Sequence, residues 1–253
     1  MNQLLRVDHL SMRYQSAEGE IDAIDDVSFS VSDGEFVSVI GPSGCGKSTM
    51  LSLIAGLMKP SGGEIKIETQ KAPKDELGYM LQKDCLFEWR TIRQNVTLGL
   101  EIRGIMSKEN LEYADQLLST YGLYDFRDSY PDRLSGGMRQ RCALIRTLVA
   151  RPEILLLDEP FSALDYQTRL AVSDDIYTII RREKKTAVMV THDISEAVSM
   201  SDRVIVLTKR PATVKSEHVI TFAGGRISPI ACREHEEFKD YFNHIWRDID
   251  VHV

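Results

Sequence analysis

Short apolar runs recur along the chain, and apolar residues return at helical spacing in several of the stretches between them. Runs of about four to eight apolar residues bounded by turn-forming residues are typical of buried strands. We therefore predict strands over residues 4–10, 27–31, 36–40, 64–67, 77–81, 154–157, 187–190 and 204–207. Val172, Ile176, Ile179 and Ile180 stand at i, i+4, i+7 and i+8, which predicts a helix that covers one face of a sheet. This alternation predicts an α/β fold with a largely parallel sheet.

The segment from 91 to 148 lacks strand signals and has a helical pattern, with breaks near Gly104, at Gly122 and at Tyr130-Pro131. It is therefore predicted to be a helical insertion. The tail from 233 to 253 mixes polar and aromatic residues, which predicts a terminal helix. Because no repeat, low-complexity tract or Pro/Gly-rich linker interrupts the sequence, we expect one continuous domain.

A glycine-rich segment at 41–48 follows a predicted strand and precedes an apolar helix, and its sequence GPSGCGKS matches G-x-x-x-x-G-K-[ST]. Glycines allow successive backbone N–H groups to surround phosphate oxygens, Lys47 adds positive charge, and the Ser48 hydroxyl can bind Mg²⁺. The alternative is an ordinary glycine-rich turn, which the flanking strand and helix disfavour. The predicted ATP-binding residues here are Gly41, Pro42, Ser43, Gly44, Cys45, Gly46, Lys47, Ser48 and Thr49.

The four cysteines show no metal-ligand spacing, so we expect free thiols in a reducing compartment. Cys45 occupies a variable position of the phosphate loop and is most simply a tolerated residue. We nevertheless predict that its thiol is partly exposed beside the helix N-terminus and can be alkylated, and that ATP protects it from alkylation.

Two carboxylates, Asp158 and Glu159, end the apolar run at 154–157. Parallel nucleotide-binding sheets hold their ligand at the carboxyl ends of the strands. Asp158 is suited to Mg²⁺, and Glu159 to polarising an attacking water. The alternative is a solvated acidic turn, which the phosphate loop in the same chain disfavours.

Charge and hydropathy narrow the possible functions. A formal net charge of -7 and a pI near 5.5 argue against a nucleic-acid binder. No apolar run approaches the length of a membrane span, and the first residues carry no recognisable secretory signal, so we expect a cytosolic protein that does not itself cross a membrane.

The segment LSGGMRQR at 134–141 resembles the signature motif of ABC transporter cassettes. A hydroxyl and two glycines at the start of a helix form an anion site. The alternative is an ordinary helix that begins with glycine. In the family, this motif closes over the nucleotide held by the phosphate loop of a second cassette. The resemblance therefore implies that Ser135, Gly136, Gly137 and Gln140 act in trans.

The other family motifs follow in order and extend the resemblance from residue 4 to about 220. Gln82 resembles the glutamine that senses Mg²⁺ and the γ-phosphate, Asp165 belongs to a D-loop-like SALD segment, and His192 resembles the switch histidine. In isolation, the glutamine would be a polar strand end and the histidine structural. Tyr14 resembles the aromatic residue that stacks on adenine, although a tyrosine near a strand can also pack in the core. The implied catalytic residues are Glu159, His192 and Gln82, and the implied metal ligands are Ser48, Gln82 and Asp158.

The resemblance implies a P-loop NTPase fold with a RecA-like parallel-sheet core, an antiparallel β subdomain and a helical insertion. Within a single ABC ATPase domain spanning 1–253, we expect the nucleotide-binding core and β subdomain at 1–86 and 152–225. The helical signature subdomain is expected at 87–151, and a C-terminal helical tail at 226–253.

Phe87-Glu88-Trp89-Arg90-Thr91, with the segments around Tyr130-Pro131 and Gln167-Thr168-Arg169, resembles importers for nitrate, sulfonates, taurine and thiamine precursors. The family usually has Leu-Pro before this tryptophan, where this chain has Phe87-Glu88. The resemblance implies a homodimer that uses ATP and Mg²⁺ to drive uptake through a separate permease. A periplasmic or lipid-anchored solute-binding protein would be an indirect partner, and the cassette would lie peripherally on the cytoplasmic side of the membrane. A non-transport ABC ATPase and an exporter cassette remain alternatives.

Overall fold

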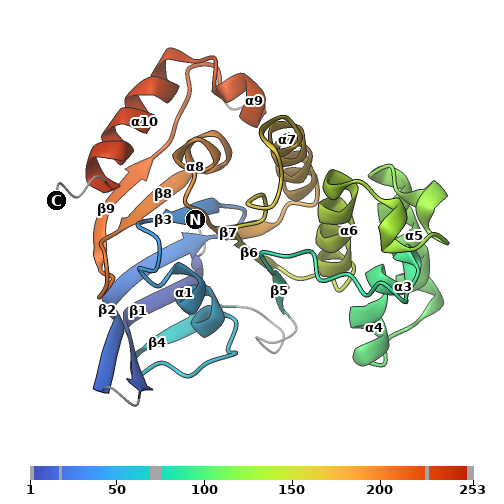
Figure 1. The fold of residues 1–253 in the computed structure, drawn as a ribbon, viewed down its shortest axis with the longest axis horizontal. Helices are drawn as coiled ribbons and strands as arrows, with labels where there is room; N and C mark the ends of the chain where they lie inside the picture. The colour runs from blue at the N-terminus through green and yellow to red at the C-terminus, as the bar shows by residue number, and fades with distance from the viewer. Residues whose placement is uncertain (1–2, 17–18, 69–75, 226–227, 250–253) are drawn as a thin grey trace.

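Two sheets form the centre of the molecule in this computed structural model, which describes residues 3–16, 19–68, 76–225 and 228–249 (Figure 1). The smaller sheet is antiparallel, in the order β2-β1-β4. The larger has the order β5-β6-β7-β3-β8-β9, and its members are parallel except for β9 at the edge. The strands are β1 Gln3–Ser16, β2 Gly19–Ser32, β3 Phe36–Ile40, β4 Gly62–Ile67, β5 Leu77–Met80, β6 Ile154–Asp158, β7 Thr186–Val190, β8 Arg203–Leu207 and β9 Val214–Val219.

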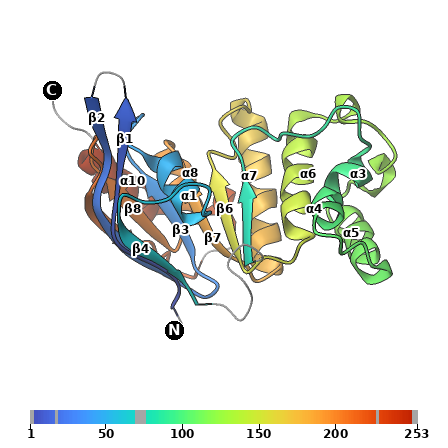
Figure 2. The same ribbon diagram turned by 90° about the horizontal axis from the view of Figure 1, so that it is seen from below.

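The helices divide into those that cover the large sheet and those that form a lobe beside it (Figures 1 and 2). The lobe contains α3 Ile92–Val96, α4 Leu98–Ile102, α5 Lys108–Thr120 and α6 Gly136–Leu148, with 3₁₀ turns at Tyr124–Phe126 and Pro131–Arg133. The others are α1 Lys47–Ile54, α7 Tyr166–Arg182, α8 Ile194–Met200, α9 Pro229–Cys232 and α10 Glu236–Ile249. Because α7 packs against both α6 and the sheet, it joins the lobe to the large sheet.

The central strands of the large sheet are buried on both faces. In β6, Leu155 and Leu157 pack into the cluster that also holds the lobe, whereas Ile154 and Leu156 pack into the cluster around α1 and the small sheet. This two-sided burial explains why these strands are continuous apolar runs. A third cluster forms where α10 packs over α8 and β8.

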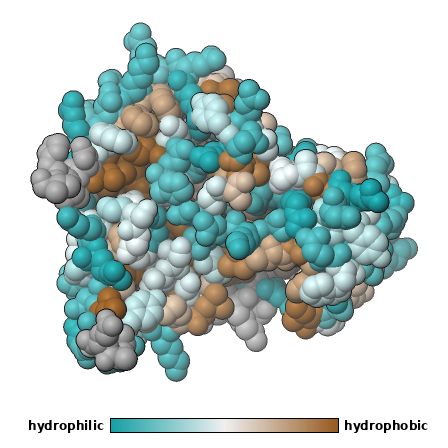
Figure 3. Space-filling model, in the orientation of Figure 1, coloured by the Kyte–Doolittle hydropathy of each residue, from teal (hydrophilic) through white to brown (hydrophobic). Residues whose placement is uncertain are grey.

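The surface is mainly polar on the face drawn in Figure 3, and its apolar side chains gather in separate small patches. Within the described ranges, no helix is both long enough and apolar enough to span a membrane.

All eight predicted strands are present, and the α/β fold with an antiparallel sheet and helices is confirmed. The helical pattern between 91 and 148 is also confirmed, and Gly104 and Gly122 have the positive φ angles expected where it breaks. The predicted strand at 77–81 ends one residue earlier, at Met80. The C-terminal segment folds as α9 and α10, while residues 226–227 and 250–253 of the predicted tail lie outside the described residues. The division into subdomains stays a prediction.

Candidate active site

The predicted chemical groups meet at the carboxyl ends of β3, β6 and β7, which lie side by side in the large sheet. The phosphate loop leaves β3, the carboxylates end β6, and Thr191-His192-Asp193 follows β7. Gln82 comes two residues after β5, the next strand along. In parallel α/β sheets this edge is the usual place for a ligand.

The phosphate loop bends around the side chain of Lys47. The Lys47 ammonium is buried and donates to the backbone oxygens of Gly41, at 2.8 Å, and Pro42, at 3.1 Å. Gly44 and Gly46 have φ angles of 75° and 119°, which side chains disfavour. A Cβ at Gly46 would also lie 3.2 Å from the backbone oxygen of Ala23. These glycines therefore permit a closed loop at the N-terminus of α1, where backbone N–H groups favour an anion.

Ser48 and Asp158 connect the loop to the end of β6. The Ser48 hydroxyl donates to Asp158 Oδ1 at 2.9 Å, and the Tyr79 hydroxyl donates to Asp158 Oδ2 at 3.2 Å. Burial raises the pKa of Asp158, although both hydroxyl donors oppose the shift. Burial likewise raises the pKa of Tyr79 to about 12, so its hydroxyl remains a donor at neutral pH.

This donor set fits Mg²⁺ bound together with nucleotide phosphates. Mg²⁺ is usually held by one or two protein oxygens, with phosphate and water completing its octahedron. Ser48 and Asp158 supply such oxygens, and the described residues contain no group of three or more acidic, histidine or cysteine side chains that would form an all-protein metal site.

Glu159, the residue after Asp158, has a left-handed backbone, with a φ of 43°. Its Oε2 lies 3.3 Å from Gln82 Nε2 and 3.2 Å from His192 Nδ1. Gln82 Nε2 also donates to Ser162 Oγ at 3.2 Å. Gln82 and His192, which were predicted separately and lie on different loops, therefore both contact Glu159.

Tyr14 lies on β1, half-buried against the cluster around α1, and its hydroxyl is 3.0 Å from Thr49 Oγ1. The contact places the ring beside the first turn of α1. Stacking of this ring on adenine stays a prediction.

The signature segment begins α6. Ser135 is exposed and caps the helix, since its Oγ accepts a hydrogen bond from the backbone N–H of Met138 at 3.4 Å. Gly137 packs so closely on α7 that a Cβ would lie 2.7 Å from Val172 Cγ2. Gln140 is only 4% exposed, and its Oε1 has no hydrogen-bond partner among the described atoms. A role in trans therefore fits the exposed Ser135 and Gly136 better than Gln140.

The predicted exposure of Cys45 is wrong. Cys45 is only 1% exposed, and its thiol lies under the loop, where a Cβ on Gly41 would be 3.1 Å from Sγ. Burial raises the pKa of this thiol, outweighing the nearby Lys47 charge. Cys85 is the exposed cysteine, and none of the four forms a disulfide bond.

Several polar residues that hold the site together were not predicted from the sequence. Tyr79 contacts Asp158, Ser162 contacts Gln82, and Arg169 donates to Asp193 Oδ2 at 3.4 Å. Arg169 and Ser162 lie within segments noted for their family resemblance, but only the folded arrangement reveals their partners. Tyr79 carried no signal, since it sits inside an apolar strand.

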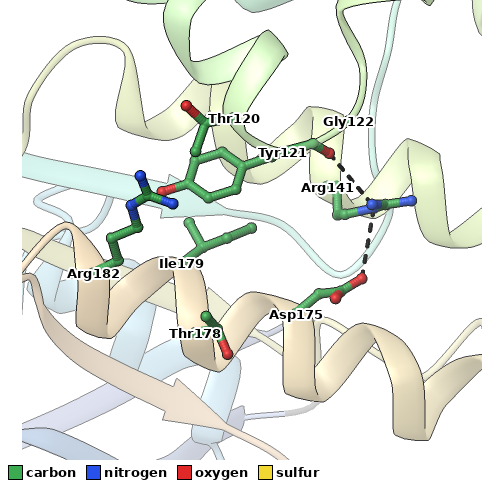
Figure 4. A pocket seen from close by; sticks show the side chains of 8 residues that line it. All are labelled: Thr120, Tyr121, Gly122, Arg141, Asp175, Thr178, Ile179 and Arg182. Atoms are coloured by element: carbon green, nitrogen blue, oxygen red, sulfur yellow. Dashed lines mark hydrogen bonds and ion pairs between the residues drawn. The ribbon is translucent and has the colours of Figure 1, made fainter.

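A separate surface pocket of about 360 Å³ lies between the end of α5, α6 and α7 (Figure 4). Arg141 points across it, with Nη1 donating to the Tyr121 backbone oxygen at 3.3 Å and Nε 3.8 Å from Asp175 Oδ2. No predicted site residue lines this pocket. Its polar groups link the helical lobe to α7, so the pocket belongs to the packing between the lobe and α7.

Comparison with known proteins places these features in a family. The profile described as ABC transporter matches residues 24–162. The ABC transporter ATP-binding protein YtlC of Bacillus subtilis (strain 168) is 44% identical over 248 residues, covering 97% of this chain and 95% of YtlC. The nitrate import ATP-binding protein NrtD of Synechocystis sp. (strain ATCC 27184 / PCC 6803 / Kazusa) is 40% identical over 227 residues, covering 89% of this chain and 85% of NrtD.

The taurine import ATP-binding protein TauB of Roseobacter denitrificans (strain ATCC 33942 / OCh 114) is 36% identical over 251 residues, covering 96% of this chain and 94% of TauB. Among solved structures, the dimeric post-hydrolysis state of the ATP-binding cassette MJ0796 with ADP and Pi matches with a TM-score of 0.73 and 34% identity. It covers 87% of this chain and all of that one. Both the profile and these relatives span the phosphate loop and the carboxylate pair. The chain therefore belongs to the ABC transporter family, as an ATP-binding protein that couples ATP hydrolysis to transport.

Proposed function

We propose that two copies of this chain form a head-to-tail dimer that hydrolyses ATP at its interface and drives uptake of a small solute through a separate permease. The solute class would be nitrate-, sulfonate- or taurine-like, or thiamine-precursor-like. One observation carries the proposal. Glu159, Gln82 and His192 converge beside the Ser48–Asp158 pair, whereas the anion-binding end of α6 is an exposed cap on another part of the fold.

In this function the phosphate loop binds and orients the nucleotide. Its backbone N–H groups and Lys47 contact phosphate oxygens, and Ser48 and Asp158 hold Mg²⁺. When bound, Mg²⁺ neutralises phosphate charge during phosphoryl transfer. Tyr14 stacks on adenine from β1.

Glu159 accepts a hydrogen bond from the attacking water and so orients it toward the γ-phosphate. Gln82 and His192 lie on either side of this carboxylate, at 3.3 and 3.2 Å, and act as the groups that sense the phosphate. The neighbouring Asp158 carboxylate instead accepts hydrogen bonds from the Ser48 and Tyr79 hydroxyls. Adjacent residues of one strand end can thus take different roles.

The second copy supplies the exposed cap of α6. Ser135 and the free first-turn N–H groups of the helix would contact phosphate held by the other chain, and Asp165, exposed at the start of α7, would face the same interface. The dimeric MJ0796 structure supports this arrangement by its similarity to the chain.

The permease would dock beside the segment that follows Gln82. Trp89 is 73% exposed and packs on Phe87, with ring centroids 4.8 Å apart. An exposed tryptophan of this kind is typical of a protein contact. The names of NrtD and TauB favour import, and the net charge of -7 disfavours a nucleic-acid partner. The protein would lie peripherally on the cytoplasmic side of the membrane, and a solute-binding protein would reach it only through the permease.

The dimer is tested with Glu159→Gln, which keeps the shape of the side chain and removes its charge. With ATP and Mg²⁺ this variant should elute as a dimer in size-exclusion chromatography, because the closed state forms but does not turn over. Glu159→Gln combined with Ser135→Arg is the matched control and should remain monomeric, since arginine blocks the exposed cap. A monomeric Glu159→Gln protein at saturating ATP-Mg²⁺ would contradict the mechanism.

The transport role is tested by purifying tagged Glu159→Gln from solubilised membranes in ATP-Mg²⁺ and identifying its partners by mass spectrometry. A polytopic permease together with a solute-binding protein supports import, and transport assays with the copurified partners then identify the solute. Recovery of ribosomal, DNA-bound or iron–sulfur assembly proteins instead would overturn it.

A further inference from the structure

Glu196 is a buried carboxylate that the proposed chemistry does not use. It lies in the first turn of α8, is only 3% exposed, and its Oε2 accepts a 2.6 Å hydrogen bond from the Thr191 hydroxyl. Its other oxygen, Oε1, lies 3.9 Å from Arg169 Nε. Burial raises the pKa of Glu196 to about 7. A buried carboxylate is costly unless it is paired, so its position calls for an explanation.

Thr191 and Asp193 connect this carboxylate to both sides of His192. The Thr191 hydroxyl, which donates to Glu196, also accepts a hydrogen bond from the Asp193 backbone N–H at 3.0 Å. Asp193 Oδ1 in turn accepts the backbone N–H groups of Ser195 and Glu196, at 2.7 and 3.2 Å. The backbone on each side of His192 is therefore fixed, while the His192 side chain remains exposed and reaches Glu159.

Arg169, in the first turn of α7, links this arrangement to the turn that contains Asp165. Its Nη2 donates to the Leu164 backbone oxygen at 3.1 Å, and its Nη1 donates to Asp193 Oδ2 at 3.4 Å. Leu164 also borders the signature segment, because a Cβ on Gly136 would lie 3.1 Å from Leu164 Cδ2. One guanidinium thus spans the turn before α7 and the turn after β7.

From these contacts we infer that Arg169, paired with Glu196, is a positioning residue that sets the place of His192 relative to the Asp165 turn. The inference rests on the proposed function, because it assigns His192 a role in hydrolysis. The geometry requires arginine, since separate guanidinium nitrogens face Leu164, Asp193 and Glu196. A lysine ammonium is a single point charge and lacks this planar fork.

The inference has a mechanistic consequence. If the dimer interface moves the Asp165 turn, the movement reaches the backbone beside His192 through the Arg169 guanidinium and Asp193. ATP binding to the phosphate loop does not involve this link, so its loss should affect turnover and leave nucleotide affinity nearly unchanged.

The test is a double-mutant cycle on the full-length protein, with single-turnover ATP hydrolysis, nucleotide affinity and thermal unfolding measured for each variant. Arg169→Met should lower the hydrolysis rate about tenfold or more, because small misplacements of catalytic groups are costly, and should change ATP affinity less than about twofold. Arg169→Lys should resemble Arg169→Met. In a His192→Ala background, Arg169→Met should cause no further loss. Arg182→Met, an exposed arginine at the far end of α7, is the matched control and should behave as wild type.

Three outcomes would contradict the inference, and the measured rates, affinities and melting temperatures distinguish them. Full activity in His192→Ala would remove the role of His192 in the proposed function and the inference with it. A slow His192→Ala protein, in which Arg169→Met still causes the same further fold-loss, would overturn only the inference, because Arg169 would then act independently. A parallel fall in ATP affinity, melting temperature and rate for Arg169→Met would likewise overturn it, since it would indicate general destabilisation.

Discussion

The Ser48 hydroxyl donates a 2.9 Å hydrogen bond to Asp158, although 110 positions separate the two residues. The bond joins the first turn of α1 to the end of β6, and β7 lies between β6 and the strand that leads into α1. The sheet therefore brings the two proposed oxygen ligands of Mg²⁺ together before any ligand binds. Pre-positioned ligands reduce the ordering cost of binding.

Ser48→Ala and Asp158→Asn should each raise the Mg²⁺ concentration needed for half-maximal hydrolysis, by about tenfold or more, because each removes or neutralises a metal ligand. The measurement is ATPase rate against free Mg²⁺ at fixed ATP. Ser52→Ala is the matched control, since Ser52 is on the same helix and its hydroxyl bonds to the Ser48 backbone oxygen and to Tyr79 rather than to Asp158. Unchanged Mg²⁺ dependence in both site variants would remove the metal assignment.

Tyr14→Ala should weaken ATP binding about tenfold, the scale of a lost aromatic stacking contact, and Tyr14→Phe should keep wild-type affinity. Tyr14→Phe also removes the hydroxyl contact with Thr49, so its free energy of unfolding should fall by about 1 kcal/mol. Binding of a fluorescent ATP analogue and chemical denaturation separate the two effects. Wild-type affinity in both variants would show that Tyr14 only packs.

Alkylation should occur first at Cys85, which is exposed, and slowly at Cys45, which is buried beneath the phosphate loop and has a raised thiol pKa. Thiolates react faster than thiols, so both burial and protonation protect Cys45. Peptide mapping after a short treatment with iodoacetamide at neutral pH gives the order. Cys85→Ser should remove most of the early labelling. Rapid modification of Cys45 in that variant would mean that the loop opens readily.

Glu196→Gln should gain stability over wild type as the pH rises. Glu196 faces Arg169, His192 and Asp193, and burial raises its pKa from 4.5 to about 7. The folded protein thus holds this proton more tightly than the unfolded chain. The resulting stabilisation is full below pH 4.5 and is lost as the pH rises through about 7.

Glutamine stays neutral throughout this range. The difference in unfolding free energy between Glu196→Gln and wild type should therefore shift in favour of the variant by up to about 3 kcal/mol between pH 4.5 and 8. Urea denaturation at several pH values measures the difference. The exposed Glu112→Gln serves as control and should show a flat profile. A flat profile for Glu196→Gln would contradict the raised pKa.

The sequence predicted the large sheet well because its central strands are buried on both faces and are therefore unbroken apolar runs. It missed β9, whose Lys215, Ser216 and Glu217 give no apolar run, because an edge strand needs only one covered face. It also underestimated β1 and β2. Their outer halves pair with each other through polar residues such as Arg13 and Asp22, so backbone pairing extends them without an apolar signal.

At the site, the sequence identified groups that lie close together along the chain, such as those of the phosphate loop. Contacts between residues far apart in the sequence gave no recognisable pattern. The contacts of Arg169 with Asp193 and of Tyr79 with Asp158 arise only when separate helices, strands and loops are brought together. The exposure of Cys45 was misjudged for the opposite reason. A loop residue next to a helix was expected to face solvent, whereas the tight curvature around Lys47 turns its thiol inward.

The left-handed backbone of Glu159 has a cost of about 1–2 kcal/mol for a residue with a side chain, whereas glycine would adopt it freely. Laboratory evolution toward heat resistance would therefore favour glycine at this position, and under the role proposed for Glu159 that variant would no longer hydrolyse ATP. A screen for a more heat-resistant form of this protein must then select for turnover at the same time, because at residue 159 heat resistance and the proposed catalytic role favour different amino acids.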